Sequence, residues 1–251
     1  MRHCEACAVL LFLCLFPVVC LGQGGPPMIT DDPGTPGDGH WEINTADIAT
    51  FARTQSINQV PYFDINYGWG DRLQLKMEGG YTIFKSAGDS AESGPGPLLV
   101  GVKWRFMDQE KDGVLSISTY PQLSFHPGYS SKNPVIAAPG NYWLLPLEFS
   151  KRWGPYAINP EIGYQYNTQS QDTWFYGVVG DYEPVKNLEL LTELHGDTVI
   201  HGGASDLLFN LGIRYPFTEH VLLIASAGHT IRTLPGTESQ WLTYLGLQFR
   251  L

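Results

Sequence analysis

Cysteine is missing from the chain beyond its first 20 residues. The four cysteines, at positions 4, 7, 14 and 20, all fall in an N-terminal segment with the layout of a secretory signal peptide. That layout is Arg2, an apolar run of about 14 residues from Ala8 to Leu21, and small residues from Gly22 onward. Cleavage that removes residues 1–22 leaves no thiol in the mature chain. This excludes a disulfide framework, a thiolate nucleophile and a Cys-ligated metal.

Long apolar runs and basic residues are also scarce. A membrane-spanning helix needs about 20 consecutive apolar residues, whereas the signal segment is shorter and is interrupted by Pro17. Lys and Arg number 15 against 25 Asp and Glu, and the net charge of −10 is unchanged when residues 1–22 are removed. A helical membrane protein is therefore excluded, and an acidic chain argues against a nucleic-acid partner.

What the chain does contain is two-residue periodicity, seen most clearly at its end. In residues 240–251, one alternate set is almost wholly apolar and the other is mixed and polar. Alternation is the period of a β-strand. About 12 residues exceed the usual strand of about 5–6 and suit a tilted strand that crosses a membrane in about 9–11. We expect this strand to close a barrel.

The same alternation recurs along the chain. Connections after odd-numbered runs are mostly long and those after even-numbered runs short, as in bacterial barrels with long outer loops and short periplasmic turns. Aromatic residues gather near both strand ends, as membrane-interface girdles do. The twelve runs span residues 40–51, 60–69, 72–84, 97–107, 114–126, 142–152, 155–166, 172–182, 187–196, 206–216, 220–230 and 240–251.

The predicted fold is an all-β, transmembrane, antiparallel up-and-down β-barrel of about 12 strands. In hydrocarbon an open sheet edge would leave unpaired backbone groups at several kcal/mol each, so the first and last strands must pair. The organisation is a signal peptide at 1–22, a Pro- and Gly-rich leader at 23–39 and the barrel at 40–251. No convincing amphipathic helix is expected after the signal peptide.

Apolar residues must face lipid, and this requirement selects which side chains point into the lumen. The inward side chains carry charges of both signs. They either form a structural network that fills a narrow barrel or line a selective pore. We expect Lys103 and Arg105 to lie beside Lys76 and Glu78. The first strand fits neither phase well at Asp47 and Ile48. The candidate lumen residues are Lys76, Glu78, Lys103, Arg105, Glu148, Arg152, Glu161, Glu193, His195, Arg214 and Arg250.

Catalytic and metal motifs are weak. There is no G-x-S-x-G, and the candidates for a hydrolytic site are the H-P-G-Y-S-S loop from His126 and the group Asp197, His201 and Asp206. His195, Asp197 and His201 could in principle ligate a metal, but nothing in a Gly-rich loop fixes their geometry. We therefore predict no catalytic residues, no metal site, no cofactor and no enzymatic activity.

The mature N-terminus carries a family resemblance. Residues 29–44, I-T-D-D-P-G-T-P-G-D-G-H-W-E-I-N, with T-D-D-P followed by G-H-W-E at the first strand, are similar to the opening of a family of outer-membrane transporters. That family is named after the meta-pathway of phenol degradation. The resemblance implies an outer-membrane location and uptake of small hydrophobic or aromatic compounds, and it carries over no binding residues.

These observations predict a monomeric channel or transporter for small-molecule solutes, in contact with outer-membrane lipid after signal-peptide export. Two alternatives remain open: an outer-membrane barrel hydrolase acting on lipid or peptide, and a secreted soluble β-barrel that binds a ligand. The soluble form requires polar residues at the lipid-facing positions, and several strands lack them. Whether the leader of residues 23–39 plugs the lumen is left open.

Overall fold

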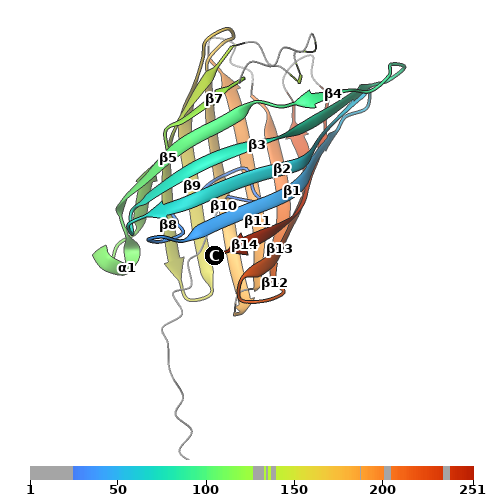
Figure 1. The fold of residues 1–251 in the computed structure, drawn as a ribbon. Coiled ribbons are helices and arrows are strands. Elements are labelled where there is room, and N and C mark those ends of the chain that lie inside the picture. Colours follow the sequence, from blue (N-terminus) through green and yellow to red (C-terminus); the bar gives the residue numbers. More distant parts are fainter. Residues whose placement is uncertain are drawn as a thin grey trace, which may run out of the picture.

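The computed structural model describes residues 25–126, 133, 135–136, 140–186, 188–200, 205–233 and 238–251. Within them the chain forms one antiparallel sheet that closes on itself (Figure 1). Its strands are β1 (Trp41–Phe51), β2 (Gln55–Trp69), β3 (Leu73–Ser86), β4 (Glu92–Pro95), β5 (Leu98–Met107), β6 (Ser116–Thr119), β7 (Gln122–Phe125), β8 (Tyr142–Trp153), β9 (Tyr156–Asn167), β10 (Thr173–Val185), β11 (Leu188–Val199), β12 (Leu207–Pro216), β13 (Val221–Arg232) and β14 (Trp241–Arg250).

The described strands make twelve positions in the wall. β6 and β7 follow one another between β5 and β8, and β4 continues the line of β5 along the upper part of β3. Closure comes from β1 and β14, which pair from Glu42↔Arg250 to Phe51↔Trp241 and lie side by side in Figure 1. The backbones of Trp41 and Leu251 exchange two further hydrogen bonds of 2.9 Å. The predicted twelve-stranded, closed, antiparallel barrel is confirmed.

Burial in this barrel is the reverse of that in a soluble protein. Large apolar side chains on β3, β5 and β8 are exposed, among them Met77 and Val102, while Glu148 and Arg214 are fully buried. Alternation produces this pattern because neighbouring residues point to opposite faces. The outside is therefore apolar and the inside charged, as the transmembrane barrel fold requires.

Exposed aromatic side chains mark both ends of the wall. Tyr156 and Tyr182 stack at the short-turn end, with ring centroids 5.0 Å apart. At the loop end, the Trp174 ring packs edge-on against Tyr164 at 5.2 Å. Two groups of exposed rings result: Trp41, Trp69, Trp153, Tyr156, Tyr182, Tyr215 and Phe217 at the short turns, and Phe51, Trp143, Tyr166, Trp174 and Trp241 at the loops.

Four local features differ from the sequence expectation. The run at 114–126 is broken at Tyr120–Pro121, where proline has no N–H to donate to the ladder. The expected loop at 85–96 contains β4, and β2 begins five residues earlier than predicted. One helical turn, α1 (Gln109–Asp112), occupies a short connection.

Helix α1 is explained by its caps. The Asp108 side chain accepts from the Glu110 N–H, and Gly113 ends the turn with a positive φ of 78°. Among the described residues, no helix is both long enough and apolar enough to cross a membrane.

Candidate functional site

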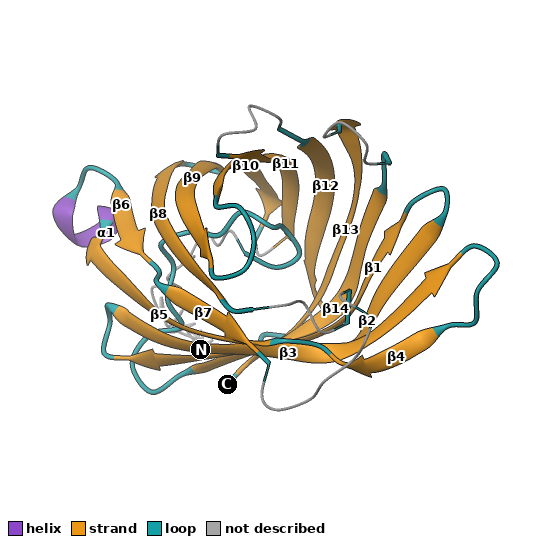
Figure 2. Ribbon diagram, turned by 90° about the horizontal axis from the view of Figure 1, so that it is seen from above, coloured by secondary structure: helices purple, strands orange, loops and turns teal. Residues whose placement is uncertain are grey.

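The described part of the leader, residues 25–39, lies inside the barrel. Figure 2, which looks down the barrel, shows coil within the ring of strands. Met28 is buried with Val179 and Leu191, which come from β10 and β11. Thr30 is fully buried, and its hydroxyl lies 3.3 Å from Nδ1 of His195. The leader is thus seated in the lumen.

The first part of the leader is held through its backbone carbonyls. The Arg214 guanidinium donates to the carbonyl of Pro26 at 2.9 Å and to that of Gly25 at 3.1 Å. Ser226 donates to the Pro27 carbonyl at 2.8 Å. Arg214 is itself fixed by Glu189, 2.7 Å away. A guanidinium has five donors in a rigid fork, so one buried side chain positions two peptide groups.

Two lumen carboxylates hold the next part through backbone N–H groups. Glu193 accepts from Thr30 at 2.6 Å and from Ile29 at 3.3 Å. Glu161 accepts from Asp31 at 3.1 Å. Hydrogen bonds to a charged acceptor each contribute about 1.5–3 kcal/mol. Three successive N–H groups of the leader are therefore matched to the acidic side of the lumen.

Lys103 holds the third part of the leader. Its ammonium lies 3.0 Å from Asp31 and 3.3 Å from Glu148, and it donates to the Asp32 carbonyl. Burial would raise the pKa of Asp31, but Lys103 and Lys76 together outweigh it and the pKa is lowered. For Asp32 burial prevails and raises the pKa to about 7. The two neighbouring carboxyls thus differ in charge near neutral pH.

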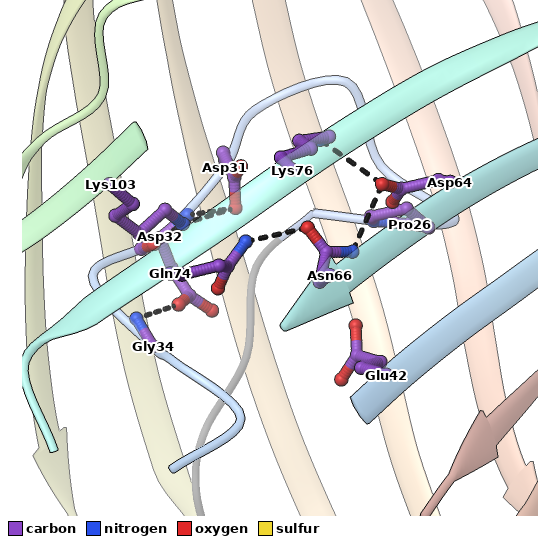
Figure 3. A pocket seen from close by; sticks show the side chains of 10 residues that line it. All are labelled: Pro26, Asp31, Asp32, Gly34, Glu42, Asp64, Asn66, Gln74, Lys76 and Lys103. Carbon is purple, nitrogen blue, oxygen red and sulfur yellow. Dashed lines mark hydrogen bonds and ion pairs between the residues drawn. The ribbon is translucent and has the colours of Figure 1, made fainter. Parts of the chain in front are cut away.

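A cavity of about 20 Å³ lies beside these groups, large enough for about one water molecule. Figure 3 shows side chains from the leader and from β1, β2, β3 and β5 converging on it. Asn66 donates to Asp64 at 3.0 Å, and Gln74 donates to Asn66 at 2.7 Å. One oxygen of Asp32 has no hydrogen-bond partner among the residues that the structure describes. The cavity is lined by Pro26, Asp31, Asp32, Gly34, Glu42, Asp64, Asn66, Gln74, Lys76 and Lys103.

Close backbone approach also seats the leader. A Cβ added at Gly68 would overlap the Gly37 carbonyl oxygen, and one added at Gly177 would overlap the Thr30 hydroxyl. The Gly39 N–H donates to the Gly68 carbonyl at 3.0 Å. Glycine is needed at position 68 because only it leaves room for a second backbone, whereas at position 177 the close neighbour is the Thr30 side chain.

The structure places all the predicted lumen residues on the inner face, but it divides them into separate groups. Lys76 pairs with Glu78 at 2.6 Å and also lines the cavity beside the leader. Arg152 pairs with Asp181 at 2.7 Å near the short turns. Five of the predicted residues hydrogen-bond or pair with the described part of the leader: Lys103, Glu161, Glu193, His195 and Arg214. The others make their described bonds with other residues of the wall and its turns: Lys76, Glu78, Arg105, Glu148, Arg152 and Arg250.

The expected cluster of Lys76, Glu78, Lys103 and Arg105 forms only in part. The Tyr120 ring lies between the two lysines, 5.5 Å from the Lys76 ammonium and 4.6 Å from that of Lys103. Arg105 turns to Asp108 at 3.4 Å and to the Asp71 carbonyl at 2.7 Å. Tyr120 enters the lumen at the break between β6 and β7, in the same alternate set as the buried Ser118 and Gln122.

The leader contacts were the main residues that the sequence reasoning missed. Asp31 and Asp32 entered the sequence analysis only as part of the T-D-D-P resemblance, and no group of three or more metal-ligating side chains occurs in the described part of the chain. The available signal was charge complementarity, since T-D-D-P places two acids in a leader that precedes a lumen containing lysine and arginine.

The hydrolase alternative gains little from the described residues. The loop after His126 lies outside them, as does His201. His229 and Ser239 do meet, 3.2 Å apart, but the Ser239 hydroxyl donates to the Thr230 carbonyl at 3.0 Å. No carboxylate pairs with His229 among the described residues. A nucleophile–base–orienter arrangement is therefore incomplete there.

The conflict in the first strand has a structural cause. The pairing of β1 with β2 shifts register between Ala46 and Ile48 at a bulge, whereas the pairing of β1 with β14 continues through both positions without a shift. Against β14, Asp47 lies opposite the exposed Leu245, whereas Ile48 lies opposite the buried Tyr244. Asp47 is thus on the outer side and Ile48 on the lumen side.

Comparison with solved structures finds outer-membrane barrels. The chain is similar to the COG4313 outer membrane channel from Pseudomonas putida F1, with a TM-score of 0.67 and 15% identity over 88% of this chain and 98% of that one. It is similar to the NanC porin, with a TM-score of 0.60 and 9% identity over 83% and 100%. It is also similar to the KdgM porin in a complex with disordered oligogalacturonate, with a TM-score of 0.56 and 13% identity over 83% of this chain and 98% of that one.

Sequence comparison adds no family. No family model matches the chain, and no curated protein matches it. At these identities the structural likeness establishes the fold alone: an outer-membrane type of β-barrel.

Proposed function

We propose that this chain is an outer-membrane channel for small-molecule solutes, and that its own leader holds the lumen closed in the state described. The observation that carries the proposal is the seating of residues 25–39 between Arg214, Glu193, Glu161 and Lys103. A sealed barrel with an apolar outside and a charged inside is suited to a bilayer. A removable internal segment gives such a barrel a closed and an open state.

The remaining parts of the proposal follow from the same chemistry. Residues 1–22 direct export, outer-membrane lipid surrounds the wall, and the barrel acts as a monomer without catalysis. The similarity of residues 29–44 to the transporters named after phenol degradation supports uptake of small molecules. Known outer-membrane channels with this fold, including the CymD monoaromatic hydrocarbon channel with a TM-score of 0.51, support the same reading.

The test is planar-bilayer conductance of the purified mature protein, with and without residues 23–39. We expect rare openings for the full chain and sustained conductance for the deletion. The matched control is the deletion variant supplied with an excess of the 23–39 peptide, which should restore closure. Absence of conductance in both forms, with the barrel shown to be folded, would overturn the channel proposal.

A further inference from the structure

A second cavity lies at the loop end of the barrel, away from the seated leader. It measures about 260 Å³ and opens between the ends of β7, β8 and β9, with Pro97 on its far side. We call it the mouth pocket. Its lining residues are Pro97, Ser124, His126, Gly140, Asn141, Tyr142, Gln165, Asn167, Gln169 and Ser170.

The chemistry of the mouth pocket differs from that of the lumen below it. Its described lining contains amides, hydroxyls and one imidazole, and no Asp, Glu, Lys or Arg. Gln165 donates to Asn167 at 2.9 Å, so two amides are held in a row along β9. Pro97 and the Tyr142 ring add apolar surface to the same lining. The described lining is therefore uncharged and presents more apolar than polar surface, with the amides, hydroxyls and imidazole as its polar groups.

His126 adds a donor and an acceptor to this lining. Burial lowers the pKa of its imidazole, so the ring is neutral at neutral pH. Both ring nitrogens are enclosed and lack a hydrogen-bond partner among the described residues. A neutral imidazole has one N–H and one free lone pair, and enclosed polar groups without partners are costly, at about 1–3 kcal/mol each.

We propose that the mouth pocket binds one ring of a small, uncharged, polyhydroxylated molecule, such as a neutral monosaccharide, before it enters the lumen. This inference rests on the proposed channel function. Hydroxyl groups that both donate and accept match the amides and the imidazole, whereas a hydrocarbon ring would leave them unpaired. A charged solute would meet no counter-charge in the described lining. The volume is slightly below the roughly 300 Å³ of the smallest drug-sized pockets, which fits a single ring.

Ligand-observed NMR with D-glucose tests the inference on the full mature chain, in a zwitterionic detergent that has no sugar head group. Saturation transfer should reach a plateau with glucose, and neither benzyl alcohol nor glucuronate should compete. The double variant His126→Leu with Gln165→Met keeps side-chain volume and removes hydrogen bonds, so glucose affinity should fall at least tenfold. Gln171→Met, in the adjacent loop and outside the pocket lining, is the matched control and should bind as the wild type does.

Each outcome is decisive for one claim. Three results would overturn the proposed role of the mouth pocket: no saturable binding of glucose, stronger binding of benzyl alcohol than of glucose, or unchanged glucose binding in the folded double variant. If the leader deletion conducts while glucose does not bind, the channel stands and the pocket assignment fails. If glucose binds as expected but no form conducts, the binding site stands and its role as an entry site falls with the channel.

Discussion

Glu193→Gln is the substitution that most directly probes how the leader is held. Glu193 accepts from two successive leader N–H groups, those of Thr30 and Ile29, and also from the Asn210 amide. A glutamine keeps the size of the side chain and one acceptor oxygen. Its NH₂ group cannot accept from the second N–H, and the remaining bond loses its charge assistance.

The expected effect on leader seating follows from those bonds. Loss of one hydrogen bond to a charged acceptor, with the other weakened, costs about 2 to 3 kcal/mol. At 1.4 kcal/mol per tenfold, this is a shift of roughly 30- to 140-fold toward the released leader. Single-channel recording should show the ratio of open to closed time rising by that factor.

Glu78→Gln is the control, because Glu78 bonds Lys76 and Tyr62 in the same lumen and makes no hydrogen bond or ion pair with the described part of the leader. It should leave the open time within about twofold of wild type. Equal open times in Glu193→Gln and wild type would refute the assigned latch. An equal rise in both variants would show that any loss of lumen charge loosens the barrel.

Three further results are expected. Burial raises the pKa of Asp32 to about 7 in the seated leader, and release of the leader returns this pKa toward about 3.9. Between these two values Asp32 is protonated only when the leader is seated, so seating weakens as the pH rises from about 4 to about 7. The open time at pH 8 should therefore exceed that at pH 5, and Asp32→Asn should remove the difference. Lys103→Met leaves Asp31 and Glu148 buried without their cation, so the free energy of unfolding in urea should fall by about 3–5 kcal/mol, and adding Glu148→Gln should recover part of it. Gly68→Ala places a methyl group against the Gly37 carbonyl, so limited proteolysis should cut the leader faster than in wild type.

Alternation predicted the wall because a strand in a membrane leaves its period in the sequence. The twelve runs, the closure of β1 on β14 and the inward set from Lys103 to Arg214 follow from that one rule. It did not reveal the break at Tyr120–Pro121 or the bulge beside Asp47, where a missing N–H and a register shift interrupt the pairing although the alternation of faces continues. Such breaks depend on neighbouring strands, which alternation within one segment does not describe.

The leader was harder to place than the wall because it has no period. Its contacts join residues more than 100 positions apart, such as Thr30 with Glu193 and Asp31 with Glu161. These are backbone N–H groups meeting carboxylates, and backbone groups carry no sequence signal. Composition shows that the leader is irregular and acidic. It does not show that the leader lies in the lumen.

The central claim, that the leader occupies the lumen, is tested most directly by disulfide trapping in a mature chain that has no cysteine of its own. A Cβ at position 177 would lie 3.0 Å from that of Thr30, close to the roughly 3.5–4.5 Å of a disulfide. Thr30→Cys with Gly177→Cys should therefore cross-link on mild oxidation of isolated outer membranes, seen as a reductant-sensitive change in gel mobility. Thr30→Cys with Gly180→Cys, on the same strand with no leader atom within 4 Å of the added Cβ, should not. Failure of the first pair to form in folded protein, or equal cross-linking of both pairs, would contradict the seated leader.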